Sequence, residues 1–218
     1  MTVPSFRLIK HAHACVELQR DQQRILVDPG ELGEAPELAG CTAVLVSHGH
    51  FDHAGRDLLE RAVAAGVPVF GPSDLAAVVS SHTLATGLTV LAPGDRRRIG
   101  GFEVEVVGGR HAPVHPERPG PENLGFLIDG RVLISGDEHP GVSVPVELLI
   151  TPVDAPWLRA VDLIEYVRSI EPATVLGVHD GLLNESGLAV ADAVLQSLTA
   201  EGAGGAVRLA PGQHLDLP

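Results

Sequence analysis

Four side chains that can bind metal ions lie close together in the segment VLVSHGHFDHAG, residues 44–55. They are His48, His50, Asp52 and His53, and they directly follow an apolar run. Imidazole and carboxylate groups together suit zinc, and also iron or manganese. If the segment curls in a loop after a buried strand, its first two histidines hold one ion while Asp52 and His53 face a second. The segment therefore predicts part of a site for two metal ions.

One segment cannot complete two coordination shells, so further ligands are expected at the ends of later strands. Three residues follow apolar runs in this way: His111 in VVGGRHAP, Asp137 in VLISGDEH and His179 in TVLGVHDG. An open α/β architecture gathers its site at the carboxyl ends of strands, which would bring these side chains together. The full expected set gives three ligands to each ion and one bridging carboxylate: His48, His50 and His111; Asp52, His53 and His179; and Asp137.

Polar residues next to these segments are candidates for contacts with a substrate. His139 lies two positions after Asp137, and Asp154 ends another predicted strand, so both are expected substrate contacts. His115 is a further candidate for the pocket wall. Asp28 in LVDPG either accepts a hydrogen bond from a ligand imidazole or begins a turn, and the sequence leaves both interpretations open. Other candidate contacts on loops are Trp157, Arg159, Arg110 and Arg118.

Hydrophobic periodicity predicts the elements that must position these residues. Residues 6–28 contain two or three short strands, and residues 42–48 form a buried strand that leads into the metal-binding segment. A helix with one apolar face follows, then another buried strand, and then a helix that opens on a Ser-Asp cap. The ranges of these three elements are 56–66, 67–71 and 73–81.

The second half of the chain repeats this order. A strand at 102–109 precedes a hairpin at 124–137, which turns at Asp129-Gly130. Strands and helices then alternate over residues 146–154, 159–170, 173–179 and 188–198, and residues 206–217 predict a final strand pair about Pro211-Gly212. Two such halves predict an α/β sandwich in four layers, with two mixed β-sheets face to face and helices outside.

The composition is that of an acidic globular enzyme. The 218 residues show no linker and suffice for one core, so we expect one domain over residues 1–218. The net charge of −13, with a single lysine, argues against a nucleic-acid partner. No apolar run approaches the roughly 18 residues of a membrane span, and the N-terminus lacks a signal-peptide pattern. We therefore expect a cytoplasmic protein without membrane association. Cys15 and Cys41 lie in apolar segments and are expected to be buried thiols.

The combination of SHGHFDH, a downstream histidine, SGD and GVH resembles the HxHxDH signature of the metallo-β-lactamase fold superfamily. The opening LIKHAHACVELQRDQQRILVDPG resembles its branch of small metal-dependent hydrolases, which is related to L-ascorbate-6-phosphate lactonase. The glycine usual in that opening motif is absent here. The resemblance covers nearly the whole chain and implies an αββα sandwich with a hydrolytic dinuclear site. It also implies that His13 is a catalytic residue that reaches the substrate or the neighbourhood of the metal ions.

The expected function is hydrolysis of a small ester, lactone or phosphodiester. Two divalent ions would lower the pKa of a bound water, and the resulting hydroxide would attack a carbonyl or phosphoryl centre. Asp52 is the expected catalytic group that orients the hydroxide and takes up its proton. Zn²⁺ is the expected ion, with Mn²⁺ and Fe²⁺ as alternatives. The expected partner is a small-molecule substrate, and a homo-oligomer is compatible with the sequence.

Two other function classes fit the same ligand set. One is a redox protein, such as a sulfur dioxygenase or a diiron centre, for which iron content and oxygen uptake would be diagnostic. The other is a metal-binding protein without turnover. The complete set of ligands favours an enzyme over this last alternative.

Overall fold

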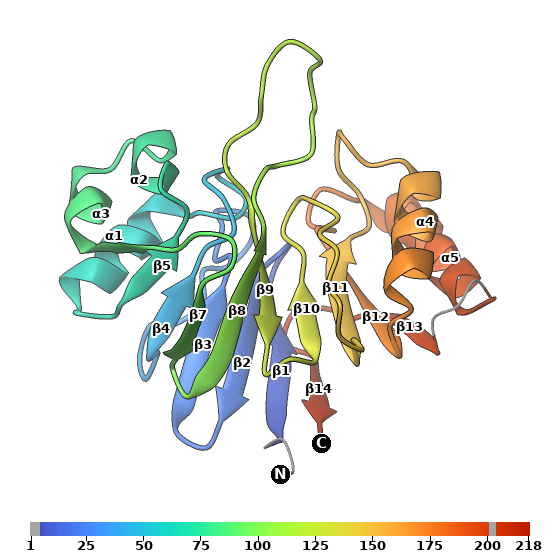
Figure 1. Cartoon of the computed structure of the whole chain (residues 1–218), viewed down its shortest axis with the longest axis horizontal. Coiled ribbons are helices and arrows are strands. Elements are labelled where there is room, and N and C mark those ends of the chain that lie inside the picture. The colour runs from blue at the N-terminus through green and yellow to red at the C-terminus, as the bar shows by residue number, and fades with distance from the viewer. Residues whose placement is uncertain (1–4, 201–203) are drawn as a thin grey trace.

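The computed structural model describes residues 5–200 and 204–218, which form two β-sheets packed face to face with helices on their outer sides. This is the four-layer α/β sandwich that the sequence predicts. In the described ranges, no helix combines the length and the apolar character that crossing a membrane requires. Beside the first sheet lie α1 (Arg56–Ala64), α2 (Leu75–Val78) and α3 (His82–Gly87), and beside the second lie α4 (Ala160–Ile170) and α5 (Glu185–Ala200) (Figure 1).

The first sheet has the strand order β14-β1-β2-β3-β4-β5-β6. Its first four members pair antiparallel. Short turns connect β1 to β2 and β2 to β3, whereas β14 comes from the other end of the chain. From β3 to β6 the pairing is parallel, and the crossover from β4 to β5 runs through α1. The strands are β1 (Phe6–Lys10), β2 (Val16–Arg20), β3 (Gln23–Val27), β4 (Ala43–Leu45), β5 (Val69–Gly71), β6 (Leu88–Val90) and β14 (His214–Leu217).

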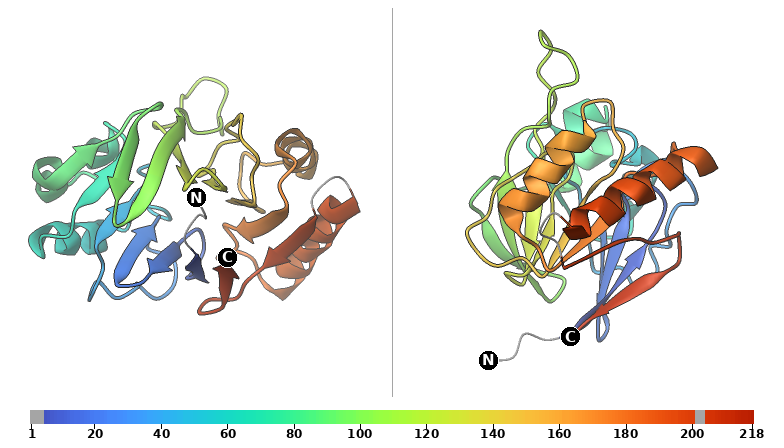
Figure 2. Two further views of the ribbon diagram at one scale, coloured as in Figure 1. Left: turned by 60° about the horizontal axis from the view of Figure 1, so that its bottom comes forward. Right: turned by 90° about the vertical axis from the view of Figure 1, so that its right-hand side faces the viewer.

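The second sheet has the order β13-β12-β11-β10-β9-β8-β7. β9 and β10 form the predicted hairpin, with Asp129 and Gly130 both at positive φ in the turn. The strands from β10 to β13 pair parallel, and α4 and α5 supply the crossovers across the outer face (Figure 2). The bounds are β7 (Arg96–Ile99), β8 (Phe102–Gly108), β9 (Leu124–Ile128), β10 (Val132–Ile134), β11 (Leu148–Pro152), β12 (Thr174–Val178) and β13 (Gly205–Arg208).

Apolar side chains from both sheets fill the space between them. Leu8 and Leu18 from the first sheet and Phe102 and Phe126 from the second are fully buried in one cluster. Separate clusters lie under the helices of each outer layer. The two sheets therefore form a rigid base for the loops at their ends.

The predicted final strand pair is wrong in its pairing. Residues 206–217 do contain two strands, but β13 pairs parallel with β12 in the second sheet, whereas β14 pairs antiparallel with β1 in the first. The turn at Gly212, with φ at 86°, carries the chain from one sheet to the other. Alternating hydrophobicity predicts strands, but it does not specify which strand each one joins.

The helix predicted over residues 73–81 is shorter than expected, and its cap differs. α2 has four residues, and the Asp74 side chain makes no capping hydrogen bond. Asp74 instead accepts the backbone N–H of Glu122 at 2.9 Å, so it ties α2 to the loop before β9. Ser81 caps the next helix, α3, by accepting the N–H of Leu84 at 3.0 Å. The local pattern predicts that the Asp74 carboxylate caps the helix, but in the structure this carboxylate binds a distant loop instead.

Candidate metal centre

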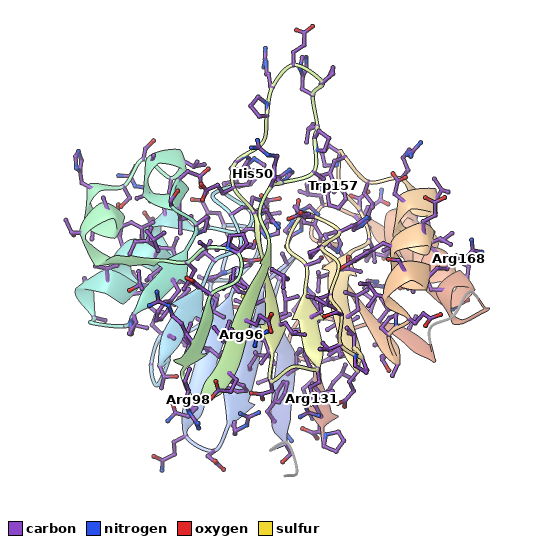
Figure 3. The ribbon with its side chains drawn as sticks, in the orientation of Figure 1. His50, Arg96, Arg98, Arg131, Trp157 and Arg168 are labelled. Atoms are coloured by element: carbon purple, nitrogen blue, oxygen red, sulfur yellow. The ribbon has the colours of Figure 1, made fainter. Side chains whose placement is uncertain are left out.

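The predicted ligands converge at one edge of the sandwich, the upper edge in Figure 1. The loop after β4 supplies four of them, and the loops after β8, β10 and β12 supply one each. Figure 3 places His50 and Trp157 at this edge, at the base of the long loop between β8 and β9. Both sheets therefore contribute to one site, as expected for the ends of strands in a sandwich of this kind.

The seven side chains form overlapping groups that could each hold an ion. Within each group the ligand atoms lie within 4.8 Å of one another. The first two groups follow the division between two ions that the sequence predicts, with His13 added to the second. The groups are His48, His50 and His111; His13, Asp52, His53 and His179; and His48, His53 and Asp137.

Asp137 lies between the two halves of this cluster. Its Oδ1 is 3.1 Å from Nε2 of His53, and its Oδ2 is 3.4 Å from Nε2 of both His111 and His179. The carboxylate is buried, with only 3% of its surface exposed. This position is the one that the sequence assigns to a bridging ligand.

Hydrogen bonds fix the Nδ1 atoms of three imidazoles and leave their Nε2 atoms directed into the cluster. His53 Nδ1 is 3.0 Å from the Asp28 carboxylate, which can only accept, so the imidazole donates. The Ser47 hydroxyl also donates to Asp28 and can accept from Nδ1 of His48 at 3.0 Å. His111 Nδ1–H donates to the carbonyl of Ala112 at 2.5 Å. Such partners set the tautomer of metal-binding imidazoles.

Both interpretations of Asp28 that the sequence left open apply at once. Its side chain accepts from His53 and Ser47, while its backbone has φ at 51° in a turn where Gly30 N–H donates to its carbonyl. The turn brings the backbone of Gly30 against the metal-binding loop. A Cβ added at Gly30 would lie 1.9 Å from the carbonyl oxygen of Asp52, so only glycine fits there.

The cluster leaves several buried polar atoms without hydrogen bonds. Nε2 of His53, Nε2 of His179 and Oδ1 of Asp137 are all in this state among the described residues. Orphaned buried nitrogen and oxygen atoms are costly, and so their convergence calls for a ligand. Nitrogen and carboxylate donors with free lone pairs are what divalent ions such as Zn²⁺ bind. The residues present therefore fit a metal centre.

The buried carboxylates and imidazoles of the cluster shift one another's pKa values. Burial raises the pKa of Asp137, but the positive charge of His53 and the close contacts with the imidazoles of His111 and His179 outweigh this effect and hold the pKa well below its usual value. Burial lowers the pKa of His179, but its contacts with Asp137 and Asp52 raise it to about 9. Burial also lowers the pKa of His48. Without ions, protons on the imidazoles thus supply the positive charge that the buried carboxylates need.

His13 contacts Asp52 and packs against the ring of His179, with ring centroids 3.9 Å apart. Its Nδ1 accepts the backbone N–H of Gly181 at 3.0 Å, so the ring hydrogen must be on Nε2. Nε2 lies 3.2 Å from Oδ2 of Asp52 and donates to it. Because Nε2 carries a hydrogen in this arrangement, its lone pair is not available to an ion. The hydrogen bonds therefore favour His13 as a partner of Asp52 over His13 as a ligand.

The other predicted pocket residues lie farther from the ligands. His139 stacks on Tyr166 with ring centroids 4.2 Å apart and contacts Trp157, not the ligand side chains. Asp154 lines a groove of about 360 Å³ between α4 and α5. His115 is exposed on the long loop between β8 and β9. The structure does not bring Asp154 or His115 into the cluster, and a substrate contact by any of the three stays a prediction.

The sequence does not predict the contacts that three further residues make with the metal-binding loops. Asn123 is fully buried, and its Oδ1 accepts the backbone N–H of Asp137 at 3.0 Å. Glu138 accepts the backbone N–H of Gly109 at 3.1 Å, which joins the loop of His111 to that of Asp137. Trp157, considered only as a substrate contact, donates its indole N–H to Asp137. A lone Asn, Glu or Trp beside a strand is too common to identify such roles.

Comparison with known proteins gives both sequence and structural relatives. The family model for the beta-lactamase superfamily domain matches residues 7–179. Protein Rv0786c of Mycobacterium tuberculosis is 30% identical over 81% of this chain and 85% of its own length. A UPF0173 metal-dependent hydrolase of Thermoplasma volcanium is 25% identical over 79% of this chain and 82% of its own length.

Among solved structures, the metallo-beta-lactamase fold protein YhfI from Bacillus subtilis superposes with a TM-score of 0.72. The alignment covers 98% of this chain and 100% of YhfI, at 16% sequence identity, so it establishes the shared fold. The family match includes every predicted ligand up to His179, and the fold agrees with it. The chain therefore belongs to the β-lactamase superfamily, with the metallo-β-lactamase fold.

Proposed function

We propose that this protein is a metal-dependent hydrolase that binds two divalent ions and hydrolyses a small ester, lactone or phosphodiester. Relatives of the chain are named metal-dependent hydrolases, and the chain is an enzyme of that class. The observation that carries the dinuclear proposal is the position of Asp137, whose two oxygens face imidazoles from both halves of the cluster.

Each ion would be held by three side chains and share Asp137. When bound, the ions supply an activated water molecule and positive charge for the oxygen atoms of the substrate. Zn²⁺ suits the mixture of imidazole and carboxylate donors, and Mn²⁺ and Fe²⁺ remain alternatives. The proposed ligands are His48, His50 and His111 for one ion, and Asp52, His53 and His179 for the other.

Asp52 is the proposed proton acceptor. His13 Nε2–H donates to its Oδ2, which leaves Oδ1 to orient the attacking water and take up its proton. Burial raises the pKa of Asp52, but the hydrogen bond from His13 and the close imidazole of His179 lower the pKa by a larger amount. The carboxylate is therefore ionised and able to accept a proton. Its side chain is 14% exposed, in contrast to the fully enclosed His48, and it lies where a substrate can reach.

The test is a hydrolysis panel on protein of defined metal content. Chelator-treated protein and protein reloaded with Zn²⁺, Mn²⁺ or Fe²⁺ are assayed against phosphodiesters, lactones, thioesters and β-lactams, with metal per chain measured by elemental analysis. We expect turnover that disappears with the chelator and returns with about two ions per chain. Protein that binds no metal after supplementation would refute the proposal. Oxygen uptake by the iron-loaded form without hydrolysis would favour a redox function instead.

A further inference from the structure

The tryptophan Trp157 touches the proposed bridging carboxylate. It is the single tryptophan of the chain and lies in the loop between β11 and α4. Its indole N–H donates to Oδ2 of Asp137 at 3.0 Å. Figure 3 shows Trp157 at the edge of the sandwich where the metal-binding loops meet. An N–H donor on a buried carboxylate is a strong interaction because the acceptor is charged.

We propose that Trp157 is a positioning residue of the metal centre, which holds the Asp137 carboxylate in the orientation that lets it face both ions, and which reports their binding through its fluorescence. The inference rests on the proposed metal centre, but not on any particular substrate. It assigns Trp157 to the support of a ligand, whereas the sequence suggested a contact with substrate.

A column of rings holds the indole in place. The indole packs edge to face on His139 with centroids 5.3 Å apart, and His139 stacks on Tyr166 at 4.2 Å with an angle of 11° between the ring planes. The Tyr166 hydroxyl donates to the carbonyl of Pro140 at 3.0 Å, which anchors the far end of the column. On its other side Trp157 meets the ring of His111 at 6.3 Å. This packing limits the rotation of the indole, so the direction of its N–H is fixed.

The Asp137 carboxylate has few hydrogen-bond donors other than the Trp157 indole. Oδ1 of Asp137 makes no hydrogen bond with the described residues and lies 3.1 Å from Nε2 of His53. Besides the indole, Oδ2 has Nε2 of His111 and of His179 at 3.4 Å, and all three imidazoles are proposed to bind the ions. An imidazole whose Nε2 binds an ion cannot also donate a hydrogen bond from that atom to Asp137. The Trp157 indole N–H is then the side-chain donor that remains for this carboxylate. Removing such a supporting hydrogen bond typically weakens metal affinity by about tenfold or more.

The first experiment follows the emission of Trp157 during a Zn²⁺ titration of chelator-treated protein. Excitation at the red edge of the band selects tryptophan over tyrosine, and the chain has one of each. We expect a saturable change in emission with the same midpoint as metal binding measured by competition with a chromophoric chelator. Emission that stays constant while the chelator reports binding would overturn the reporter role.

The second experiment measures Zn²⁺ affinity after the N–H is removed. Trp157→Phe deletes the donor. Ser197→Ala is the control, since it removes a side-chain hydrogen bond to the Val194 carbonyl on α5, away from the metal-binding loops. We expect about tenfold or greater loss of affinity in Trp157→Phe and wild-type affinity in the control. Equal affinity in Trp157→Phe and wild type would overturn the proposal.

A third measurement separates the hydrogen bond from the bulk of the ring. Replacing the one tryptophan by β-(3-benzothienyl)alanine keeps the shape of the side chain but lacks the N–H. We expect the loss of Zn²⁺ affinity to persist in this protein and to match the loss in Trp157→Phe. Wild-type affinity in the analogue would assign the effect to packing and overturn the positioning role. Because no substrate is used, a failure here is distinct from a failure to find hydrolysis.

Discussion

At the scale of single residues, Asp52 has two separable roles, as a ligand and as a proton acceptor. We expect Asp52→Ala to lower kcat by at least about a hundredfold, since a positioned acid–base group contributes roughly 10²–10⁴. The variant should still bind about one ion, because His48, His50 and His111 form a separate group. Elemental analysis and steady-state kinetics measure both. Asp57→Ala, on the exposed start of α1, is the control. Undiminished turnover in Asp52→Ala would exclude the proposed role.

The raised pKa of His179 predicts a pH dependence of metal binding. Its pKa is about 9 in the metal-free protein, above the usual 6.5, so the proton bound below pH 9 must leave before an ion can take Nε2. Apparent Zn²⁺ affinity should therefore rise by at least about tenfold per pH unit from pH 7 toward pH 9, since the pKa of His53, another proposed ligand of the same ion, is also raised. The same shift stabilises the metal-free fold fully below about pH 6.5, and this contribution is lost as pH rises through 9.

Competition with a chelator of known proton affinity, at pH 7, 8 and 9, measures this dependence. The melting temperature of the chelator-treated protein over the same range checks the opposite sign for the metal-free form. Affinity that stays level across the range, after correction for the chelator, would mean that His179 is already neutral at pH 7.

At the scale of elements, the turn after β3 must lie against the metal-binding loop. A methyl group at Gly30 would overlap the backbone of Asp52, so Gly30→Ala must displace one of the two loops. We expect the variant to lose the ion held by Asp52, His53 and His179 and to melt at a lower temperature. Gly141→Ala is the control, because a Cβ there meets nothing within 4 Å. Metal content near wild type in Gly30→Ala would show that the loops can separate without cost to the site.

The single lysine joins a loop of the first sheet to a loop of the second. Lys10 ends β1, is fully buried, and donates to the carbonyl of His11 at 2.7 Å and to Asp180 at 3.3 Å. Desolvation lowers its pKa, but the carboxylate of Asp180 opposes that effect. Since His13 and His179 flank these contacts, the ion pair fixes both loops behind the metal centre.

We expect Lys10→Met to lower the free energy of unfolding by about 3 kcal/mol, because it leaves the buried Asp180 with less compensation. Urea denaturation of chelator-treated protein measures the change. The double variant Lys10→Met with Asp180→Leu should recover part of the loss, since it removes the uncompensated charge. A single variant as stable as wild type would show that the ion pair contributes nothing to the link between the loops.

At the scale of the whole molecule, the proposed metal centre has ligands from both sheets, so bound ions would connect the two sheets. Ligands from the loop after β4 belong to the first sheet, and His111, Asp137 and His179 follow strands of the second. Ions that bind only the folded chain should raise its stability by about 2.7 kcal/mol at a free concentration of 100 times Kd. Calorimetry at increasing free Zn²⁺ should therefore show a rising melting temperature. A melting temperature independent of metal would mean that the ions do not bridge the sheets.

The local pattern of the chain determined its elements and the chemistry of its site. Hydrophobic periodicity predicts strands and helices, because an element that buries one face has apolar residues at the spacing of that face. The ligand types and their places after strands are equally local, which is why His48, His50, Asp52 and His53 stand out in the sequence. The repeated order of strands and helices predicted two sheets face to face, the family resemblance implied the same arrangement, and the structure confirmed it.

Contacts between distant segments were decided only by the tertiary structure. The sequence does not show that β14 leaves its neighbour to pair with β1, since edge strands of either sheet offer equivalent backbone groups. Nor does it show that Gly181 fixes the tautomer of His13, or that Trp157 and Asn123 hold Asp137. A hydrogen bond depends on distance and angle between groups far apart in the chain, and residue type and spacing do not encode either.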